Sequence, residues 1–199
     1  MALFRPSQSV DRLVVGLGNP GSAYEGTPHN VGYRVVEELA RRHGFARAKR
    51  GFDGRCAEGA IGGRATLLLQ PTTFMNDSGR SVAAALRALK LRPEAVLVVH
   101  DHIDLPFGRL RLIEGGGSGG HNGLKSITGL IGAGYSRLRV GVDRPPSTDP
   151  DVVADFVLSP FRESRAEVDA LVAAAADAVE LWLDHGLEAA ANDVNRLER

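Results

Sequence analysis

Five polar residues of this 199-residue chain have the types that an acyl-transfer site needs. They are one histidine, one aspartate and three asparagines: His29, Asp101, Asn19, Asn76 and Asn122. A neutral histidine can take a proton from water, and a carboxylate can hold its ring in the useful tautomer. An asparagine amide can donate a hydrogen bond to a developing oxyanion. The set therefore predicts hydrolysis of an acyl ester or amide by direct attack of water.

A covalent intermediate is not expected. No serine lies in a Gly-x-Ser-x-Gly elbow, and the one cysteine, Cys56, has no activating neighbour in the sequence. Each candidate also has an ordinary structural explanation. Asn19 suits a glycine turn, and Asn76 and Asn122 suit helix caps. Asp101 could simply pair with an arginine, so whether these residues form a site depends on the fold that brings them together.

The segment around His29 predicts a strand, a turn and the start of a helix. The apolar run 13–15 is typical of a buried parallel strand, and the glycines and proline of 16–21 predict a turn. Thr27 suits a helix N-cap and Pro28 the first helical position, so we expect a helix over about 27–43. His29 then lies in the first helical turn, where free N–H groups favour the neutral imidazole.

Strands and helices alternate along the rest of the chain. Strands are expected at about 65–70, 95–99, 109–113 and 137–142, and helices at 78–90, from 121 onward and at 161–185. The strand at 109–113 is expected at an edge, and that at 137–142 is expected to be half-exposed. The pattern predicts a single α/β domain over 1–199, with 1–11 as an N-terminal extension. Its sheet is expected to be mostly parallel, or mixed, and twisted, with helices on both faces and converging loops.

Composition bounds the class of protein. One cysteine excludes an internal disulfide and suits a reducing cytoplasm, and no apolar run reaches membrane-spanning length. Residues 1–142 hold 19 of the 24 Lys and Arg but 11 of the 24 Asp and Glu, an excess of eight positive charges. That asymmetry suggests a basic face. The densest basic run could follow a phosphate backbone or be a solvated loop; it comprises Arg41, Arg42, Arg47, Lys49, Arg50 and Arg55.

Three other motifs are weak. Residues 16–21 match Gly-x-Gly-x-x-Gly, but the helix signals come too late for a dinucleotide site, and the acids at the right distance lie mid-helix. His100 and His102 would share one face of a strand and Asp101 the other, a poor metal cage without a distant ligand such as His121. A P-loop is excluded because no Gly-Lys-Ser/Thr occurs. Neither a metal nor a cofactor is expected.

Four motifs, in order along the chain, resemble those of the bacterial peptidyl-tRNA hydrolases. The resemblance spans residues 13 to about 158 and rests on Gly16-Leu17-Gly18-Asn19-Pro20-Gly21 with Tyr24 and His29-Asn30-Val31-Gly32, on Pro71-Thr72-Thr73-Phe74-Met75-Asn76-x-Ser78-Gly79, on His100-Asp101-x-x-Asp104-Leu105-Pro106, and on Gly119-Gly120-His121-Asn122-Gly123-Leu124. It implies a monomeric cytoplasmic enzyme of one α/β domain. Such an enzyme cleaves the ester between a nascent peptide and the 3′ ribose of tRNA.

The resemblance also implies roles for individual residues. His29 would be the catalytic base and Asp101 its partner. Asn19 and Asn76 would hold the peptide and the ester, and Asn122 would position the water or stabilise the oxyanion. The remaining residues expected at the substrate are Tyr24, Phe74 and Met75 in the cleft, and Lys125, Arg137 and Arg139 as phosphate contacts to the acceptor end of the tRNA.

Three positions depart from the family pattern. Pro28 stands where the family commonly has arginine, His102 where it usually has an acid, and Glu114 where many members are neutral or basic. Two rival functions are an RNA-binding protein without catalysis and a hydrolase of another acyl ester that does not contact RNA. A base with its carboxylate has no use in a pure binder, and salt-sensitive binding would argue against the second rival.

Overall fold

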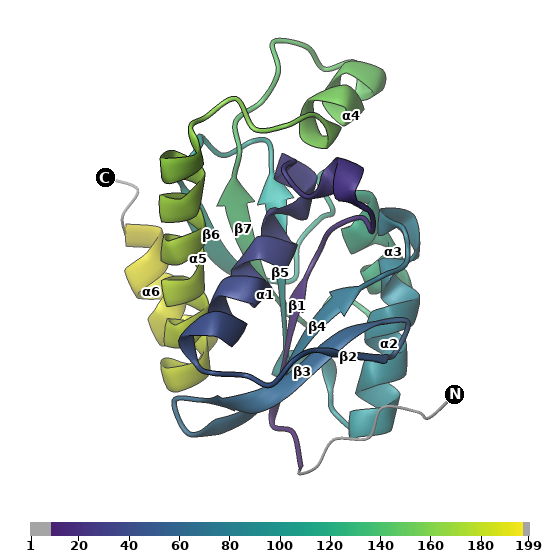
Figure 1. Cartoon of the computed structure of the whole chain (residues 1–199), viewed down its shortest axis with the longest axis vertical. Coiled ribbons are helices and arrows are strands. Elements are labelled where there is room, and N and C mark those ends of the chain that lie inside the picture. Colours follow the sequence, from purple (N-terminus) through teal and green to yellow (C-terminus); the bar gives the residue numbers. More distant parts are fainter. Residues whose placement is uncertain (1–8, 197–199) are drawn as a thin grey trace.

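A seven-stranded mixed sheet forms the centre of the computed structural model, which describes residues 9–196 (Figure 1). The strand order is β2-β3-β4-β1-β5-β7-β6. The strands are β1 (Arg12–Gly16), β2 (Lys49–Gly51), β3 (Gly54–Ile61), β4 (Arg64–Pro71), β5 (Val96–His102), β6 (Leu110–Glu114) and β7 (Ser136–Gly141). The central strands β4, β1, β5 and β7 are parallel, whereas β2, β3 and β6 pair antiparallel. The predicted α/β class with a mostly parallel sheet is therefore confirmed.

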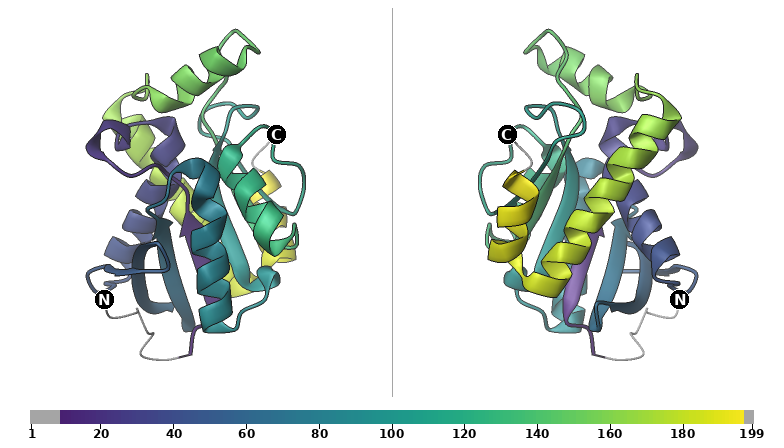
Figure 2. Two further views of the ribbon diagram at one scale, coloured as in Figure 1. Left: turned by 90° about the vertical axis from the view of Figure 1, so that its right-hand side faces the viewer. Right: turned by 90° about the vertical axis from the view of Figure 1, so that its left-hand side faces the viewer.

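Helices cover both faces of this sheet (Figure 2). They are α1 (Val31–Arg42), α2 (Ser78–Leu89), α3 (Asn122–Ile131), α4 (Pro150–Leu158), α5 (Arg165–His185) and α6 (Leu187–Arg196). One face packs against α1, α5 and α6, and the other against α2 and α3. The short helix α4 lies apart, beyond the end at which the parallel strands finish (Figure 1). No helix among the described residues combines the length and the apolar character that crossing a membrane requires.

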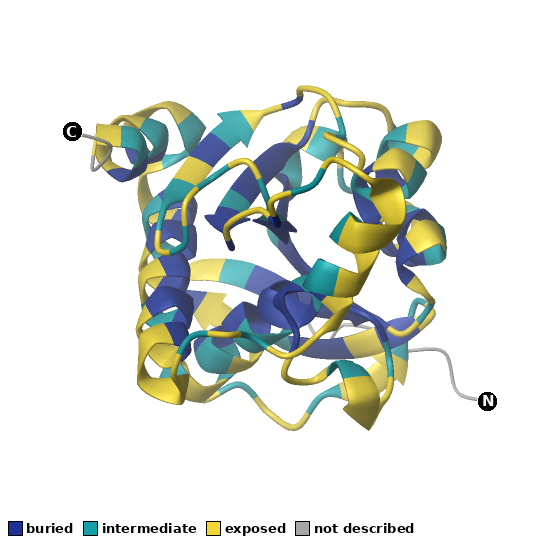
Figure 3. Ribbon diagram, turned by 90° about the horizontal axis from the view of Figure 1, so that it is seen from above, coloured by how far each residue is buried: buried dark blue, intermediate teal, exposed yellow. Residues whose placement is uncertain are grey.

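Alternation along the strands divides the core into two layers. On β1, Val14 packs with the α1, α5 and α6 layer, whereas Leu13 and Val15 pack with the α2 and α3 layer. All three side chains are buried because β1 lies in the middle of the sheet. Viewed from the end of the parallel strands, buried residues occupy the centre and exposed residues the surrounding loops (Figure 3). That end is where ligands bind in open α/β sheets.

Several boundaries differ from those expected. Residues 28–30 form a 3-10 turn and α1 starts only at Val31; the Thr27 hydroxyl donates to the carbonyl of Tyr24 instead of capping the helix. The expected helix at 161–185 begins at Arg165, because Ser164 and Glu167 form a capping box there. The hairpin β2–β3 and the helices α4 and α6 were not predicted. Residues 1–8 of the expected N-terminal extension lie outside the described residues.

The strand expected to be half-exposed is buried instead. β7 lies between β5 and β6, and five of its six residues are buried. The alternation of basic and apolar residues in 137–142 suggested one solvated face. That expectation was wrong because the face that carries the basic residues is covered as well: Arg137 bonds to Gly117 in the loop before α3 and to Thr128 on α3. The strand β6 is the edge strand, as predicted.

Candidate active site

The position of His29 depends on a close approach of backbones. Gly32, in the first turn of α1, packs so tightly on the sheet that a side-chain carbon there would overlap the backbone nitrogen of Leu17 and the carbonyl oxygen of Val99. The start of α1 therefore lies directly against β1 and β5. The 3-10 turn before it places His29 beside Asp101 at the end of β5.

His29, which is half-buried, and Asp101, which is buried, form a hydrogen-bonded pair. Nδ1 of His29 lies 3.0 Å from Oδ1 and 3.1 Å from Oδ2 of the Asp101 carboxylate. An ionised carboxylate can only accept, so Nδ1–H donates and Nε2 is left as the proton acceptor. Burial alone would lower the pKa of His29, but the charge and hydrogen bond of Asp101 outweigh it and the pKa is raised above 6.5. The pair has the geometry of a general base with its orienting carboxylate.

A second imidazole, which the sequence did not point to as a catalytic neighbour, also binds Asp101. Nε2 of His121 lies 3.1 Å from Oδ1 of Asp101, while its Nδ1 accepts the backbone N–H groups of Gly123 at 3.1 Å and Leu124 at 3.4 Å. Because Nδ1 accepts, the proton of His121 must be on Nε2 and must donate to Asp101. Burial opposes ionisation of Asp101, but His29 and His121 hold its pKa well below the usual range.

The same three side chains are the only described group whose atoms are close enough to bind a metal. One ligand atom each from His29, Asp101 and His121 lie within 4.8 Å of one another. A metal on Nε2 of His121 would require a proton on Nδ1, yet Nδ1 already accepts two backbone N–H groups. The hydrogen bonds therefore fit two imidazoles that both donate to the Asp101 carboxylate better than they fit a metal centre.

His100 and His102, which the sequence also offered as metal ligands, are not part of this group. His100 is fully buried, and its Nδ1 donates to the backbone carbonyl of Asp101 at 2.6 Å. Burial holds the pKa of His100 well below 6.5. His102 lies on the same face of β5 as His100, and their ring centroids are 6.1 Å apart. The second imidazole bound to the Asp101 carboxylate is therefore that of His121, whereas His102 points to the opposite face of the sheet.

Asn19 is held with its amide in one orientation. Its backbone N–H donates to Oδ1 of Asn30 at 2.8 Å, and Nδ2 of Asn30 donates back to its carbonyl at 3.0 Å. Oδ1 of Asn19 accepts the backbone N–H of Met75 at 2.9 Å. This bond fixes the amide so that its Nδ2–H donors remain available to a substrate. Asn30 was not singled out from the sequence, because nothing in its spacing shows that it bonds to a backbone eleven residues away.

The other expected site residues lie on neighbouring elements. Met75 is buried against Gly123, where a side-chain carbon would come within 2.6 Å of the methionine sulfur. Asn76 and Asn122 are exposed near the starts of α2 and α3. Tyr24 is half-buried in the loop after β1, and Phe74 is 62 % exposed.

A closed series of contacts connects all of these segments. Asn30 adjoins His29 and bonds to Asn19, Asn19 bonds to Met75, and Met75 packs against the start of α3. His121, at the start of α3, bonds to Asp101, which bonds to His29. The fold therefore brings together four segments that lie far apart in the sequence, as convergence at the end of a parallel sheet predicts.

The basic residues differ in their exposure. Lys125 is exposed on α3, and Arg139 is half-buried on β7, where burial and the nearby Arg111 and Arg137 lower its pKa. Arg137 itself is 0 % exposed and bonds to the backbone, so it cannot contact a phosphate as the sequence analysis expected. In the basic run, Arg42 is bound to acids of α1 and α5 and is not directed at solvent.

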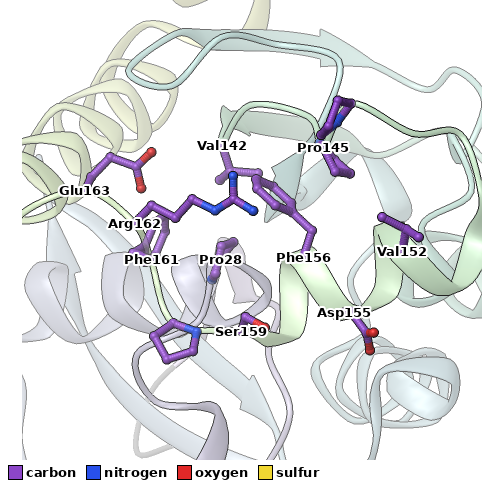
Figure 4. A pocket seen from close by; sticks show the side chains of 12 residues that line it. Pro28, Val142, Pro145, Val152, Asp155, Phe156, Ser159, Phe161, Arg162 and Glu163 are labelled. Carbon is purple, nitrogen blue, oxygen red and sulfur yellow. The ribbon is translucent and has the colours of Figure 1, made fainter.

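Two cavities border the site. One of about 490 Å³ is lined by Asn19, Asn30, Tyr33 and Arg55, among others. Another of about 230 Å³ lies between the turn at Pro28 and α4, and Figure 4 shows the ring of Phe156 and the guanidinium of Arg162 directed into it. The first cavity adjoins a site residue directly, whereas the second lies behind the turn that carries His29.

Known proteins match the chain along almost all of its length. The family model of peptidyl-tRNA hydrolase matches residues 13–199. The peptidyl-tRNA hydrolase of Nocardia farcinica is 52 % identical over 92 % of this chain and 95 % of its own, and that of Rhodopseudomonas palustris (strain BisB18) is 47 % identical over 87 % and 86 %. A crystal structure of the enzyme from Acinetobacter baumannii superposes with a TM-score of 0.84 at 38 % identity, covering 96 % of this chain and 97 % of that one. The chain belongs to the peptidyl-tRNA hydrolase family.

Proposed function

We propose that this protein hydrolyses the ester between a peptide and the 3′ ribose of tRNA by attack of a water molecule that His29 activates, without a covalent intermediate. Family membership supports the reaction class. The observation that carries the mechanism is the hydrogen bond from Nδ1 of His29 to Asp101, because it leaves Nε2 available to accept a proton. Neither a metal nor a cofactor has a role in this mechanism.

The reaction proceeds in two proton-coupled steps. Nε2 of His29 takes a proton from water as the water oxygen attacks the ester carbonyl carbon, and Asp101 stabilises the imidazolium that forms. Asn122 positions the water or donates to the oxyanion, while Nδ2 of Asn19 and the amide of Asn76 hold the ester and the peptide. Collapse of the tetrahedral intermediate breaks the bond to the ribose 3′ oxygen, which takes the proton from His29.

The tRNA is held by its phosphates. Lys125 is exposed in the first turn of α3, and Arg139 is half-buried on β7. Contacts to phosphate give affinity without sequence preference, which suits an enzyme that accepts many tRNAs. We propose that a monomer binds the acceptor end of the tRNA through these two residues, with Tyr24, Phe74 and Met75 lining the path of the ester and peptide. The 490 Å³ cavity beside Asn19 offers room for the peptide.

The experiment that tests this function measures release of an N-acetylated amino acid from acylated tRNA in EDTA. We expect efficient cleavage by the wild type and a loss of about 10²-fold or more in His29→Ala, as for a lost general base. His43→Ala is the matched control, because His43 is an exposed histidine that pairs with Glu180 on α5. Binding of tRNA without cleavage by the wild type would favour the RNA-binding rival. Full activity in His29→Ala would overturn the proposed mechanism but would leave the proposed reaction standing.

A further inference from the structure

Arg137 is a charged side chain that the fold buries completely. It is 0 % exposed on β7, and its guanidinium lies 4.6 Å above the ring of Tyr135. Nη1 donates to the carbonyl of Gly117 at 2.9 Å, and Nη2 donates to the hydroxyl of Thr128 at 3.3 Å. Nε is buried without a hydrogen-bond partner among the described residues. Burying an arginine that is only partly satisfied is costly, so an apolar side chain would serve a purely structural role better.

The loop that Arg137 binds has few other means of support. In residues 115–120 every position except Ser118 is glycine, and Gly115, Gly116, Gly119 and Gly120 adopt positive φ values. Glycine contributes no side-chain packing and loses the most conformational freedom on ordering. The loop is therefore positioned by hydrogen bonds to its backbone, and the bond from Arg137 reaches its middle at Gly117.

This loop leads directly to His121 and Asn122. It ends at His121, whose backbone N–H donates to the carbonyl of Ser118 and whose ring bonds to Asp101. Asn122 follows as the first residue of α3. The second bond of Arg137 goes to Thr128, which lies on α3 beyond these two residues. One guanidinium therefore holds the chain on both sides of His121 and Asn122.

We propose that Arg137 is a positioning residue for ester hydrolysis: its fork fixes the 115–120 loop and α3 so that His121 meets Asp101 and Asn122 meets the reacting ester. This inference rests on the proposed function of the site. Arg137 acts through these residues and contacts neither the substrate nor the tRNA. A displacement of about 1 Å in a catalytic group can lower the rate by about 10²-fold, so loss of the fork acts on kcat.

The experiment compares Arg137→Met, Arg137→Lys and Arg139→Met, the last as a matched variant two residues along the same strand face. In Arg137→Met we expect kcat for the acylated tRNA to fall by about tenfold or more while KM changes less than about twofold. Arg137→Lys keeps the charge but lacks the planar fork that spans Gly117 and Thr128, so its kcat should lie between those of the wild type and Arg137→Met. Arg139→Met should instead raise KM, because its expected partner is a phosphate.

Hydrogen exchange of residues 115–124 gives a readout that does not depend on activity. In Arg137→Met we expect the amides of Gly115 and His121, bonded to the carbonyls of Tyr135 and Ser118, to exchange at least about tenfold faster, with β1 and β5 unchanged. Unchanged exchange in the loop, or a raised KM at unchanged kcat, would overturn the positioning role. If Arg137→Met does not fold, Thr128→Val, which removes the hydroxyl that Arg137 binds, is tested by the same kinetic and hydrogen-exchange measurements. An inactive wild type would contradict the proposed function, and the exchange data would still test the anchoring.

Discussion

At the scale of single residues, we expect Asp101 to set the pH range in which His29 can accept a proton. The carboxylate raises the pKa of His29 above 6.5, and a protonated imidazole cannot accept a proton from water. We therefore expect kcat/KM to fall as the pH drops through a value above 6.5. Asp101→Asn removes the negative charge that raises the pKa of His29, so the acid limb of the profile should move to lower pH. The plateau rate should fall by about 10²- to 10⁴-fold.

A pH profile of kcat/KM for the wild type and Asp101→Asn provides the measurement. His43→Ala serves as the control, since His43 lies on the surface near α5, and its profile should match that of the wild type. If the acid limb stays in place in Asp101→Asn, the group that titrates is not His29, and the pairing seen in the structure has no bearing on the rate.

The sequence pointed to the residues proposed to carry out the reaction more readily than to those that hold them in place. Asn19, His29 and Asp101 could be identified because their types suit a reaction and because each follows a strand or starts a helix. Asn30 and His121 act through hydrogen bonds to distant groups, and the pattern of residues gives no sign of such bonds. Arg137 was assigned to the surface because its burial depends on α3 and the loop before it, whose packing over β7 is not specified by local alternation.

At the scale of elements, the contact between α1 and the sheet should be the most sensitive to a small change. A methyl group at Gly32 would overlap backbone atoms of Val99 on β5 and of Leu17, the residue that follows β1. Backbone cannot yield as a flexible side chain can, so we expect Gly32→Ala to lower the free energy of unfolding by about 3 kcal/mol or to prevent folding. Denaturant unfolding measures this. Gly26→Ala is the control, because nothing lies within 4 Å of a side-chain carbon there, and equal losses in both variants would contradict the close packing.

A second contact between elements is made by Arg42. Its guanidinium binds Glu38 on its own helix, Asp177 and Glu180 on α5, and the carbonyl of Ala173. Several partners that meet one partly buried fork stabilise more than a single surface pair, so Arg42→Met should lower the free energy of unfolding by about 1 kcal/mol.

Arg41→Met is the matched comparison for Arg42→Met. The neighbouring Arg41 is 72 % exposed and pairs with Glu38 alone. We expect no measurable loss of stability in this variant. Equal losses in the two variants would show that the link between α1 and α5 contributes nothing.

For the whole molecule, the ion pairs between α1 and α5 show that part of the positive charge in the first two-thirds of the chain is matched by acids of the last third. The excess of eight negative charges lies in residues 143–199, and part of it is directed at the basic residues of α1. Arg34 binds Asp169, and Arg42 binds Asp177 and Glu180. The acids of α5 therefore compensate Arg34 and Arg42, and only Arg42 belongs to the densest basic run. Arg42 is therefore a poor candidate for a phosphate contact, whereas Lys125 and Arg139 are expected to make such contacts.

Salt dependence of tRNA binding separates these two groups of residues. Each lysine or arginine that contacts a phosphate contributes about one unit to the slope of log affinity against log salt. We expect Lys125→Met and Arg139→Met each to reduce that slope by about 1, whereas Arg42→Met, whose charge is already matched by acids, should leave it unchanged. A reduced slope in Arg42→Met alone would place the RNA along α1 and the β2–β3 hairpin, opposite to the path proposed from α3 and β7.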